Sequence, residues 1–303
     1  MPAKGGRGAI SIRRLAAGEV CHAEKPLLCV ATDAAQACLL CHFCLAPLDP
    51  VDDHIGAVTP SLVRQGTAAP AALLDGAAAQ LCSAVEGCGC RICGARICRA
   101  EECQQEKRRA AAGSGEGCGA SGCCPALVAW REKWPRMAAS PRCRLFLLAL
   151  SRAIRPGPEV FVAAVIDTLC QPSLPEDNEQ QTAHARMELE LVEPLATLHS
   201  IMLSVWVSQL QSASDRSPAQ LLDAWCTPKG YRSFERRIAT NAHGLRLRSP
   251  VGAALASAIA AAPTLDSAGQ HDVAVAVAAV DGELPFYSAT AVFAVASALN
   301  HSW

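Results

Sequence analysis

The sequence contains few aromatic residues and almost no net charge. Phenylalanine, tryptophan and tyrosine together make up 4% of the 303 residues, whereas the apolar fraction is 51%. A core built from this composition must be mainly aliphatic. The formal net charge is −1 at pH 7, so no global basic field favours nucleic acid or an acidic membrane surface. We therefore predict no direct nucleic-acid site.

Long apolar runs and an export signal are also missing. No run reaches the ~18 residues that a membrane-spanning helix needs. The first eight residues lead into no apolar segment of the kind found in secretory signal peptides. We expect a protein of the cytoplasm, the nucleus or both, with no membrane partner. One alternative stays open: residues 1–18 carry four basic side chains and no acidic one, which loosely fits an organelle transit peptide.

Cysteine, in contrast, is abundant and clustered. Of the 17 cysteines, nine lie between residues 82 and 124, and three more lie at positions 38, 41 and 44. Two Cys-x-x-Cys pairs begin at Cys41 and at Cys90, and a two-residue spacer lets both sulfurs of a pair reach one zinc ion. In a chain without an export signal, such pairs bind metal more often than they form disulfides. We predict about two zinc ions, with disulfides or unligated buried cysteines as the alternatives.

Two histidines lie near the cysteine pairs. His42 lies inside the first pair, between residues that already face the metal. His54 falls in a segment rich in alanine, proline and glycine, and we expect its side chain to be solvated. Neither is predicted to be a ligand.

Residues 130 onward have a helical pattern. Apolar residues at steps of three and four predict helices over 145–154, 161–169 and 183–211, the last kinked or divided by Pro194. A further helix starts at Ser217-Pro218, and an alanine-rich one covers 251–262. Residues 273–280 alternate as a strand would, but their alanines favour helix, so the pattern leaves both assignments open. Residues 8–32 are predicted to form a small β unit.

Four stretches of the chain resemble the SET-and-MYND family of protein lysine methyltransferases. Residues 6–19, with Gly-Arg-Gly and a later Gly-Glu, resemble the opening strands of the SET domain. The cysteine pairs that follow resemble the MYND zinc finger inserted after those strands. Residues 225–244, with Trp-Cys-Thr-Pro-Lys-Gly-Tyr and Thr-Asn, are similar to the family's helical insert. Residues 282–302 are similar to the strand that leads to the family's Asn-His-Ser-Cys motif.

The resemblance implies an α+β fold. Its core is a β-rich split SET domain with an inserted MYND-type zinc finger and a helical SET-insert region, incomplete at the C-terminus. The opening SET strands would occupy residues 1–37, and the zinc finger with flexible loops residues 38–124. The helical insert would occupy 125–270, and 271–303 would begin the core SET region.

The resemblance also implies binding residues. Contacts to S-adenosylmethionine would come from Gly6, Arg7, Gly8, Asn241, Asn300 and His301. The alternatives are a helix-end cap for Asn241 and a frayed chain end for Asn300. By the family's cross-brace pattern, one zinc would be held by Cys41, Cys44, Cys98 and Cys103. The second would be held by Cys90, Cys93, Cys118 and Cys124, with Cys88 and Cys123 as reserves. Here the chain departs from the family, which usually offers histidine and then cysteine at the last two positions.

Two functions follow from the resemblance. One is S-adenosylmethionine-dependent methylation of a lysine in a protein substrate, such as a histone or a ribosomal protein. The family's catalytic tyrosine lies downstream of the Asn-His-Ser motif, beyond residue 303, so we identify no catalytic residue and expect the chain alone to be inactive. The alternative is a catalytically inactive, zinc-dependent protein-interaction module, with proline-rich peptides as partners of the zinc finger.

Overall fold

The computed structural model describes residues 14, 16–17, 24–48, 53–54, 57, 96–105, 125–153, 160–169, 178–206, 218–278, 280 and 285–293. These residues form a mixed α+β structure, which confirms the predicted class. The described part is mostly helical, with one small sheet, rather than β-rich. None of its helices is long and apolar enough to cross a bilayer.

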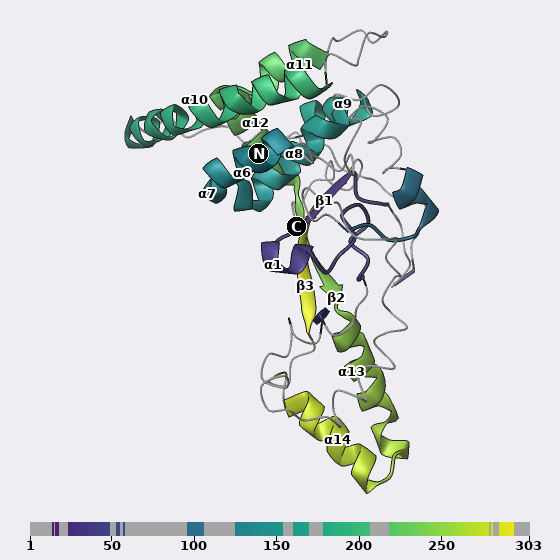
Figure 1. The fold of residues 1–303 in the computed structure, drawn as a ribbon. Helices are drawn as coiled ribbons and strands as arrows, with labels where there is room; N and C mark the ends of the chain where they lie inside the picture. Colours follow the sequence, from purple (N-terminus) through teal and green to yellow (C-terminus); the bar gives the residue numbers. More distant parts are fainter. Residues whose placement is uncertain are drawn as a thin grey trace. The chain divides into compact units, whose positions relative to one another are not determined.

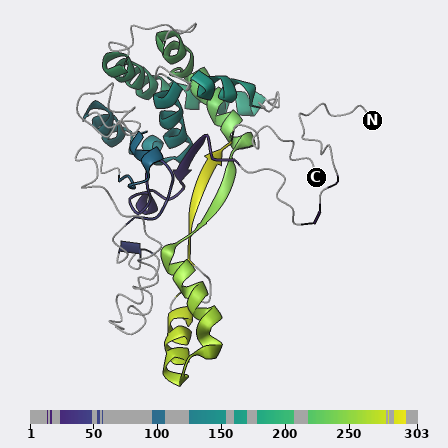
Figure 2. The same ribbon diagram turned by 90° about the vertical axis from the view of Figure 1, so that its right-hand side faces the viewer.

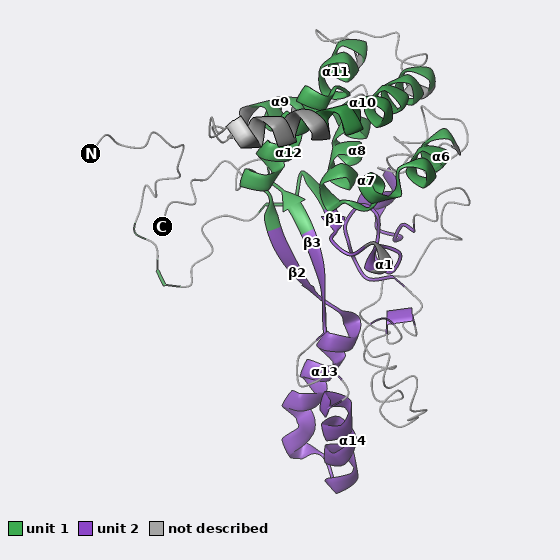
Figure 3. Cartoon of the chain, turned by 90° about the vertical axis from the view of Figure 1, so that its left-hand side faces the viewer, with its two compact units in different colours: residues 1–29, 124–243, 290–303 green, residues 30–123, 244–289 purple. Residues whose placement is uncertain are grey.

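The chain divides into two compact units (Figure 3). The first unit comprises residues 1–29, 124–243 and 290–303, and the second comprises 30–123 and 244–289. The four-part division expected from the family resemblance stays a prediction.

The first unit is built from helices (Figure 1). Its described helices are α6 (Pro125–Lys133), α7 (Pro135–Ala139), α8 (Pro141–Ala153), α9 (Val160–Thr168), α10 (Asn178–Trp206), α11 (Pro218–Trp225) and α12 (Pro228–Asn241). Five of these seven begin on a proline. A proline suits the first turn of a helix because the missing N–H has no partner there anyway. The sequence thus marks most helix starts directly.

Helix α8 forms the core of the first unit. Nine of its 13 residues are buried, including Leu145, Phe146 and Leu150. Phe146 packs edge-on against Tyr231 and Phe234 of α12, with ring centroids 4.9 and 5.1 Å apart. Three of the chain's aromatic residues therefore pack together where α8 and α12 meet.

Helix α10 remains one helix through Pro194. The indole N–H of Trp130 on α6 donates to the backbone carbonyl of Pro194 at 2.8 Å. This contact, together with a 2.7 Å ion pair between Lys133 and Glu193, attaches α6 to the middle of α10. The predicted division of this helix at Pro194 is therefore wrong, and residues 207–211 of the predicted range lie outside the described residues.

The sheet has three strands in the order β1-β3-β2, formed by Leu28–Ala31, Phe286–Val292 and His243–Arg248. Strands β1 and β3 run antiparallel: Leu27 N–H donates to Val292 at 2.8 Å, and Thr32 N–H donates to Ser288 at 2.7 Å. Strand β1 confirms the end of the β unit expected over residues 8–32. Short helix α1 (Ala34–Ala37) follows it.

Strands β2 and β3 are connected by a helical hairpin (Figure 2). Helix α13 (Pro250–Ala261), the short 3-10 helix Ala262–Thr264 and helix α14 (Ser267–Ala278) follow one another, and α13 packs on α14. The ambiguous segment 273–280 is thus helical through residue 278. Alanine's helix preference prevails there over the alternating pattern.

The start of α13 is closely packed against the residue before β3. Ser249 caps the helix, its hydroxyl accepting from Gly252 N–H at 2.9 Å and donating to Pro285 carbonyl at 3.0 Å. A Cβ on Gly252 would lie 2.2 Å from the same Pro285 oxygen. Only glycine allows this approach.

We expect Gly252→Ala to destabilise the protein, because the backbone must move to admit the methyl group. Overpacking of this kind costs about 1–3 kcal/mol. Gly244→Ala is the matched control, since a Cβ there meets nothing within 4 Å. Urea unfolding of both variants measures the difference. Equal midpoints for the two variants would contradict the packing described here.

Candidate metal centre

Four cysteine side chains converge in the second unit. The sulfur atoms of Cys41, Cys44, Cys98 and Cys103 all lie within 4.8 Å of one another. The Cys44 and Cys98 sulfurs are 3.7 Å apart although these residues are separated by 54 positions. No other group with this geometry occurs among the described residues. The predicted first zinc site therefore has its four ligands together.

The first pair lies on a tight turn. Cys41 N–H donates to Ala46 carbonyl at 2.8 Å, and Leu45 N–H donates to Cys41 carbonyl at 2.9 Å. Leu45 has a φ of 59°, a left-handed conformation that is unfavourable for a bulky side chain. A bridge between Leu40 and Pro47 closes the turn. This folding turns both sulfurs of the Cys-x-x-Cys pair toward one point.

The second pair is positioned by a helical turn. Residues 101–105 are helical, and they carry Cys103. The Gln104 side chain donates to Cys98 carbonyl at 2.6 Å, which fixes the preceding loop against this turn. Four residues separate Cys98 from Cys103, and the helical turn brings their two sulfur atoms together.

The two pairs are joined by backbone contacts and a small core. His42 N–H donates to Arg96 carbonyl at 3.0 Å, and Cys98 N–H points at the Cys41 sulfur at 3.4 Å. Leu48 and Ile97 pack on the cysteines, with exposures of 0% and 6%. This apolar cluster is small, so folding buries little apolar surface here. The segment that carries the four cysteines therefore needs another source of stability.

The thiols affect one another's ionisation. A hydrogen bond from the Cys44 thiol, supported by backbone N–H groups, lowers the pKa of Cys41 to about 5 against the opposing effect of burial. The same hydrogen bond raises the pKa of Cys44. Burial, followed by repulsion from the Cys41 thiolate, raises the pKa of Cys103 to about 12. Without a cation, the cluster thus favours one thiolate beside protonated neighbours.

The cluster fits zinc. A tetrahedral ion with Zn–S bonds of about 2.3 Å separates its sulfurs by about 3.8 Å, close to the 3.7 Å between Cys44 and Cys98. Four thiolates are a donor set that zinc prefers, and the described cysteines form no disulfide. A set of four protein ligands leaves no open position for a substrate, which is typical of a structural site and not of a catalytic one.

His54 is buried, so the expectation that it is solvated is wrong. Its side chain is 0% exposed. Nε2 lies 2.6 Å from Leu48 carbonyl, which only accepts, so this nitrogen carries the proton. Nδ1 lies 2.5 Å from the Tyr287 hydroxyl on β3. No local sequence pattern links residues 233 positions apart, so this pair could not be predicted.

Asn241 is the one predicted cofactor residue that the structure describes. It ends α12, is 4% exposed, and its side-chain amide donates to Arg237 carbonyl at 2.7 Å. This contact matches the helix-end role, and the cofactor role stays a prediction. The other predicted cofactor residues lie outside the described residues: Gly6, Arg7, Gly8, Asn300 and His301. So do the ligands expected for a second zinc and their reserves: Cys88, Cys90, Cys93, Cys118, Cys123 and Cys124.

Comparison with known proteins adds no assignment. No family model, curated protein or solved structure matches the chain. Arguments about function therefore depend on the residues themselves.

We expect Cys44→Ser to remove zinc from this site and to destabilise the second unit. Cys38→Ser is the matched control, because Cys38 is exposed, lies three residues before the first ligand and is not part of the cluster. Zinc content measured by mass spectrometry of purified protein should fall by about one ion only in the first variant. The loss of zinc from both variants, or from neither, would contradict the ligand set.

We expect zinc affinity to increase with pH. Cys44 and Cys103 have raised pKa values, so both carry protons at pH 7 and must release them when the metal binds. Adding zinc to metal-free protein in weak buffer should therefore acidify the solution, and lowering the pH should release the metal. A pH-indicator titration measures the protons, and their absence would exclude thiolate ligation.

We expect His54→Phe to destabilise the zinc-loaded protein. The change leaves the Leu48 carbonyl and the Tyr287 hydroxyl without these partners, at about 1–3 kcal/mol for each buried group. Tyr287→Phe, which disturbs only one of the two contacts, should cost less. Urea unfolding compares them, and a larger loss for Tyr287→Phe would contradict the bridging role of His54.

Proposed function

We propose that this chain is part of an S-adenosylmethionine-dependent protein lysine methyltransferase of the SET-and-MYND type, in which the metal centre is structural. The proposed substrate is a lysine side chain of a histone or a ribosomal protein. Zinc supplies a rigid cross-link between distant segments, and it takes no part in methyl transfer.

The observation that carries this proposal is the choice of cysteines at the metal centre. In the described part of the chain, Cys41 and Cys44 converge with Cys98 and Cys103, and these four ligands are enough for one tetrahedral zinc ion. This is the ligand set that the family resemblance implies for the first zinc of a cross-brace finger. The resemblance would assign Cys90 and Cys93 to a second zinc, and both lie outside the described residues.

The helical region gives further support. The segment from Trp225 to Asn241, on which the resemblance partly depends, forms the end of α11 and the whole of α12. Thr227 caps α12 by accepting from Gly230 N–H at 3.0 Å, and Pro228 starts the helix. The residues shared with the family thus have local structural tasks, and Asn241 is held at the helix end.

A second candidate is a zinc-dependent protein-interaction module without activity. The observation in its favour is the closed, four-thiolate character of the centre, which stabilises a fold and offers no reactive position. Its partners would be proline-rich peptides.

Cofactor binding separates the two candidates. Saturation-transfer NMR with S-adenosylhomocysteine detects weak binding to the zinc-loaded chain. The methyltransferase proposal predicts a signal that Asn241→Ala removes, because the resemblance assigns Asn241 to the cofactor. Thr240→Ala, at the exposed neighbouring position, should keep the signal. A signal that folded Asn241→Ala leaves unchanged would count against the methyltransferase proposal.

A further inference from the structure

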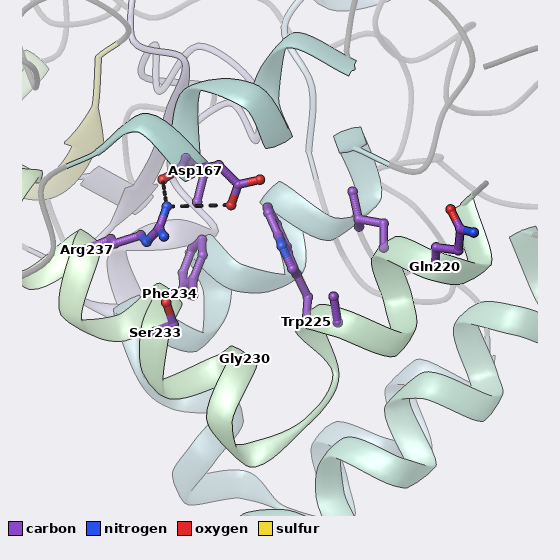
Figure 4. Close-up of a pocket in the computed structure, with 10 residues that line it drawn as sticks. Asp167, Gln220, Trp225, Gly230, Ser233, Phe234 and Arg237 are labelled. Carbon is purple, nitrogen blue, oxygen red and sulfur yellow. Dashed lines mark hydrogen bonds and ion pairs between the residues drawn. The ribbon is translucent and has the colours of Figure 1, made fainter. Parts of the chain in front are cut away.

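A pocket in the first unit is lined by residues of three helices. It is enclosed by α9, α11 and α12 and has a volume of about 420 Å³ (Figure 4). Sites for small ligands typically occupy ~300–1,000 Å³. The pocket includes neither Asn241 nor any cysteine. A ligand bound here would thus be distinct from both zinc and S-adenosylmethionine.

One side of the pocket is apolar and firmly supported. Ile166 and Phe234 are 2% and 3% exposed, and Leu221 and Trp225 also line this side. The Trp225 and Phe234 rings are 6.0 Å apart, and both pack on buried Phe146. These contacts hold the rings in place before any ligand arrives.

Gly230 allows the two helices that form the pocket to meet closely. A Cβ at this position would lie 2.1 Å from Ala224 carbonyl and 2.9 Å from the Trp225 Cα. The start of α12 therefore lies directly against the end of α11. This close approach sets the distance between Trp225 and the residues of α12 that line the other side.

The pocket also contains an ion pair that leaves one donor unused. The Arg237 guanidinium donates to Ile166 carbonyl at 2.6 Å and lies 3.5 Å from the Asp167 carboxylate (Figure 4). Its Nε is buried and has no hydrogen-bond partner among the described residues. A buried donor without a partner costs about 1–3 kcal/mol.

The charges on this side of the pocket select the ligand's polar group. Asp167 already balances the charge of Arg237, so an anionic ligand gains little net attraction and is repelled by the carboxylate. A cationic ligand likewise gains little net attraction, because Arg237 repels it. A neutral amide suits both groups, because its carbonyl can accept from the guanidinium and its N–H can donate to the carboxylate.

We propose that this pocket binds a hydrophobic residue of a peptide. The apolar side chain enters between Leu221, Trp225 and Phe234. Its backbone amide pairs with Arg237 and Asp167. The proposal is independent of the function proposed above, because it uses none of the zinc ligands and not Asn241.

N-acetyl-leucinamide is the probe for this site, and saturation-transfer NMR with the full zinc-loaded chain is the measurement. We expect the probe to bind. 4-Methylpentanoate has the same branched apolar end but an anionic group, and its affinity should be lower by about tenfold or more. Ala-Leu-Ala with blocked ends should bind at least as well as the single residue. Equal binding of the carboxylate would overturn the proposal in favour of an anion site. Loss of binding for the longer peptide would restrict the pocket to free small molecules and overturn it too.

Two substitutions place the binding in this pocket. Ala224→Leu fills it from an exposed helical position and should abolish the signal, whereas Ala239→Leu, on an exposed position of α12 that does not line the pocket, should preserve it. Arg237→Lys keeps the charge beside Asp167 and removes the planar guanidinium that lines the pocket, so binding of the amide should weaken severalfold. Circular dichroism verifies that each variant is folded. Undiminished binding by folded Ala224→Leu or by Arg237→Lys would overturn the proposal.

Discussion

The convergence of four sulfur atoms, placed so that they could share one ion, constrains the described part of the second unit. Cys44 and Cys98 are 54 positions apart, and closing a loop of that length costs on the order of 3–4 kcal/mol in chain entropy. A structural zinc site supplies roughly 10–16 kcal/mol at pH 7. The metal can therefore offset loop closure, and it can also hold Leu45 in its unfavourable left-handed conformation. The few apolar residues around the cluster could not do this alone.

Elsewhere in the described residues, several side chains donate hydrogen bonds to backbone carbonyls. Trp130 donates to Pro194, Arg237 to Ile166, and Asn241 to Arg237. The Trp130 and Arg237 contacts each join two helices, whereas the Asn241 contact lies within α12. In a chain with so few aromatic residues, these directional contacts supplement an aliphatic core that by itself would specify helix positions only loosely.

Local features of this fold could be predicted from the sequence, whereas contacts between residues far apart in the chain could not. The spacing of apolar residues and the alanine-rich run located α8, α9 and α13 closely, and Ser217-Pro218 located the start of α11. The Cys-x-x-Cys pair at Cys41 identified the metal centre, because two cysteines with a two-residue spacer can both bind one zinc ion. Its partners, Cys98 and Cys103, came from a family resemblance and not from spacing. The His54–Tyr287 contact and the Arg237–Asp167 pair depend on tertiary packing between segments with no common periodicity, so no pattern could have predicted them.

The pairing of β1 with β3 has a consequence for the order in which the chain acquires structure during synthesis. Strand β1 ends at Ala31 and β3 begins at Phe286. While the ribosome is still adding the helices, β1 has no partner strand and its backbone groups and apolar side chains stay available to other proteins. Helices α6 to α12 depend on contacts closer in sequence and can form earlier. The nascent chain is thus a natural client for chaperones that cover exposed strands until translation reaches β3.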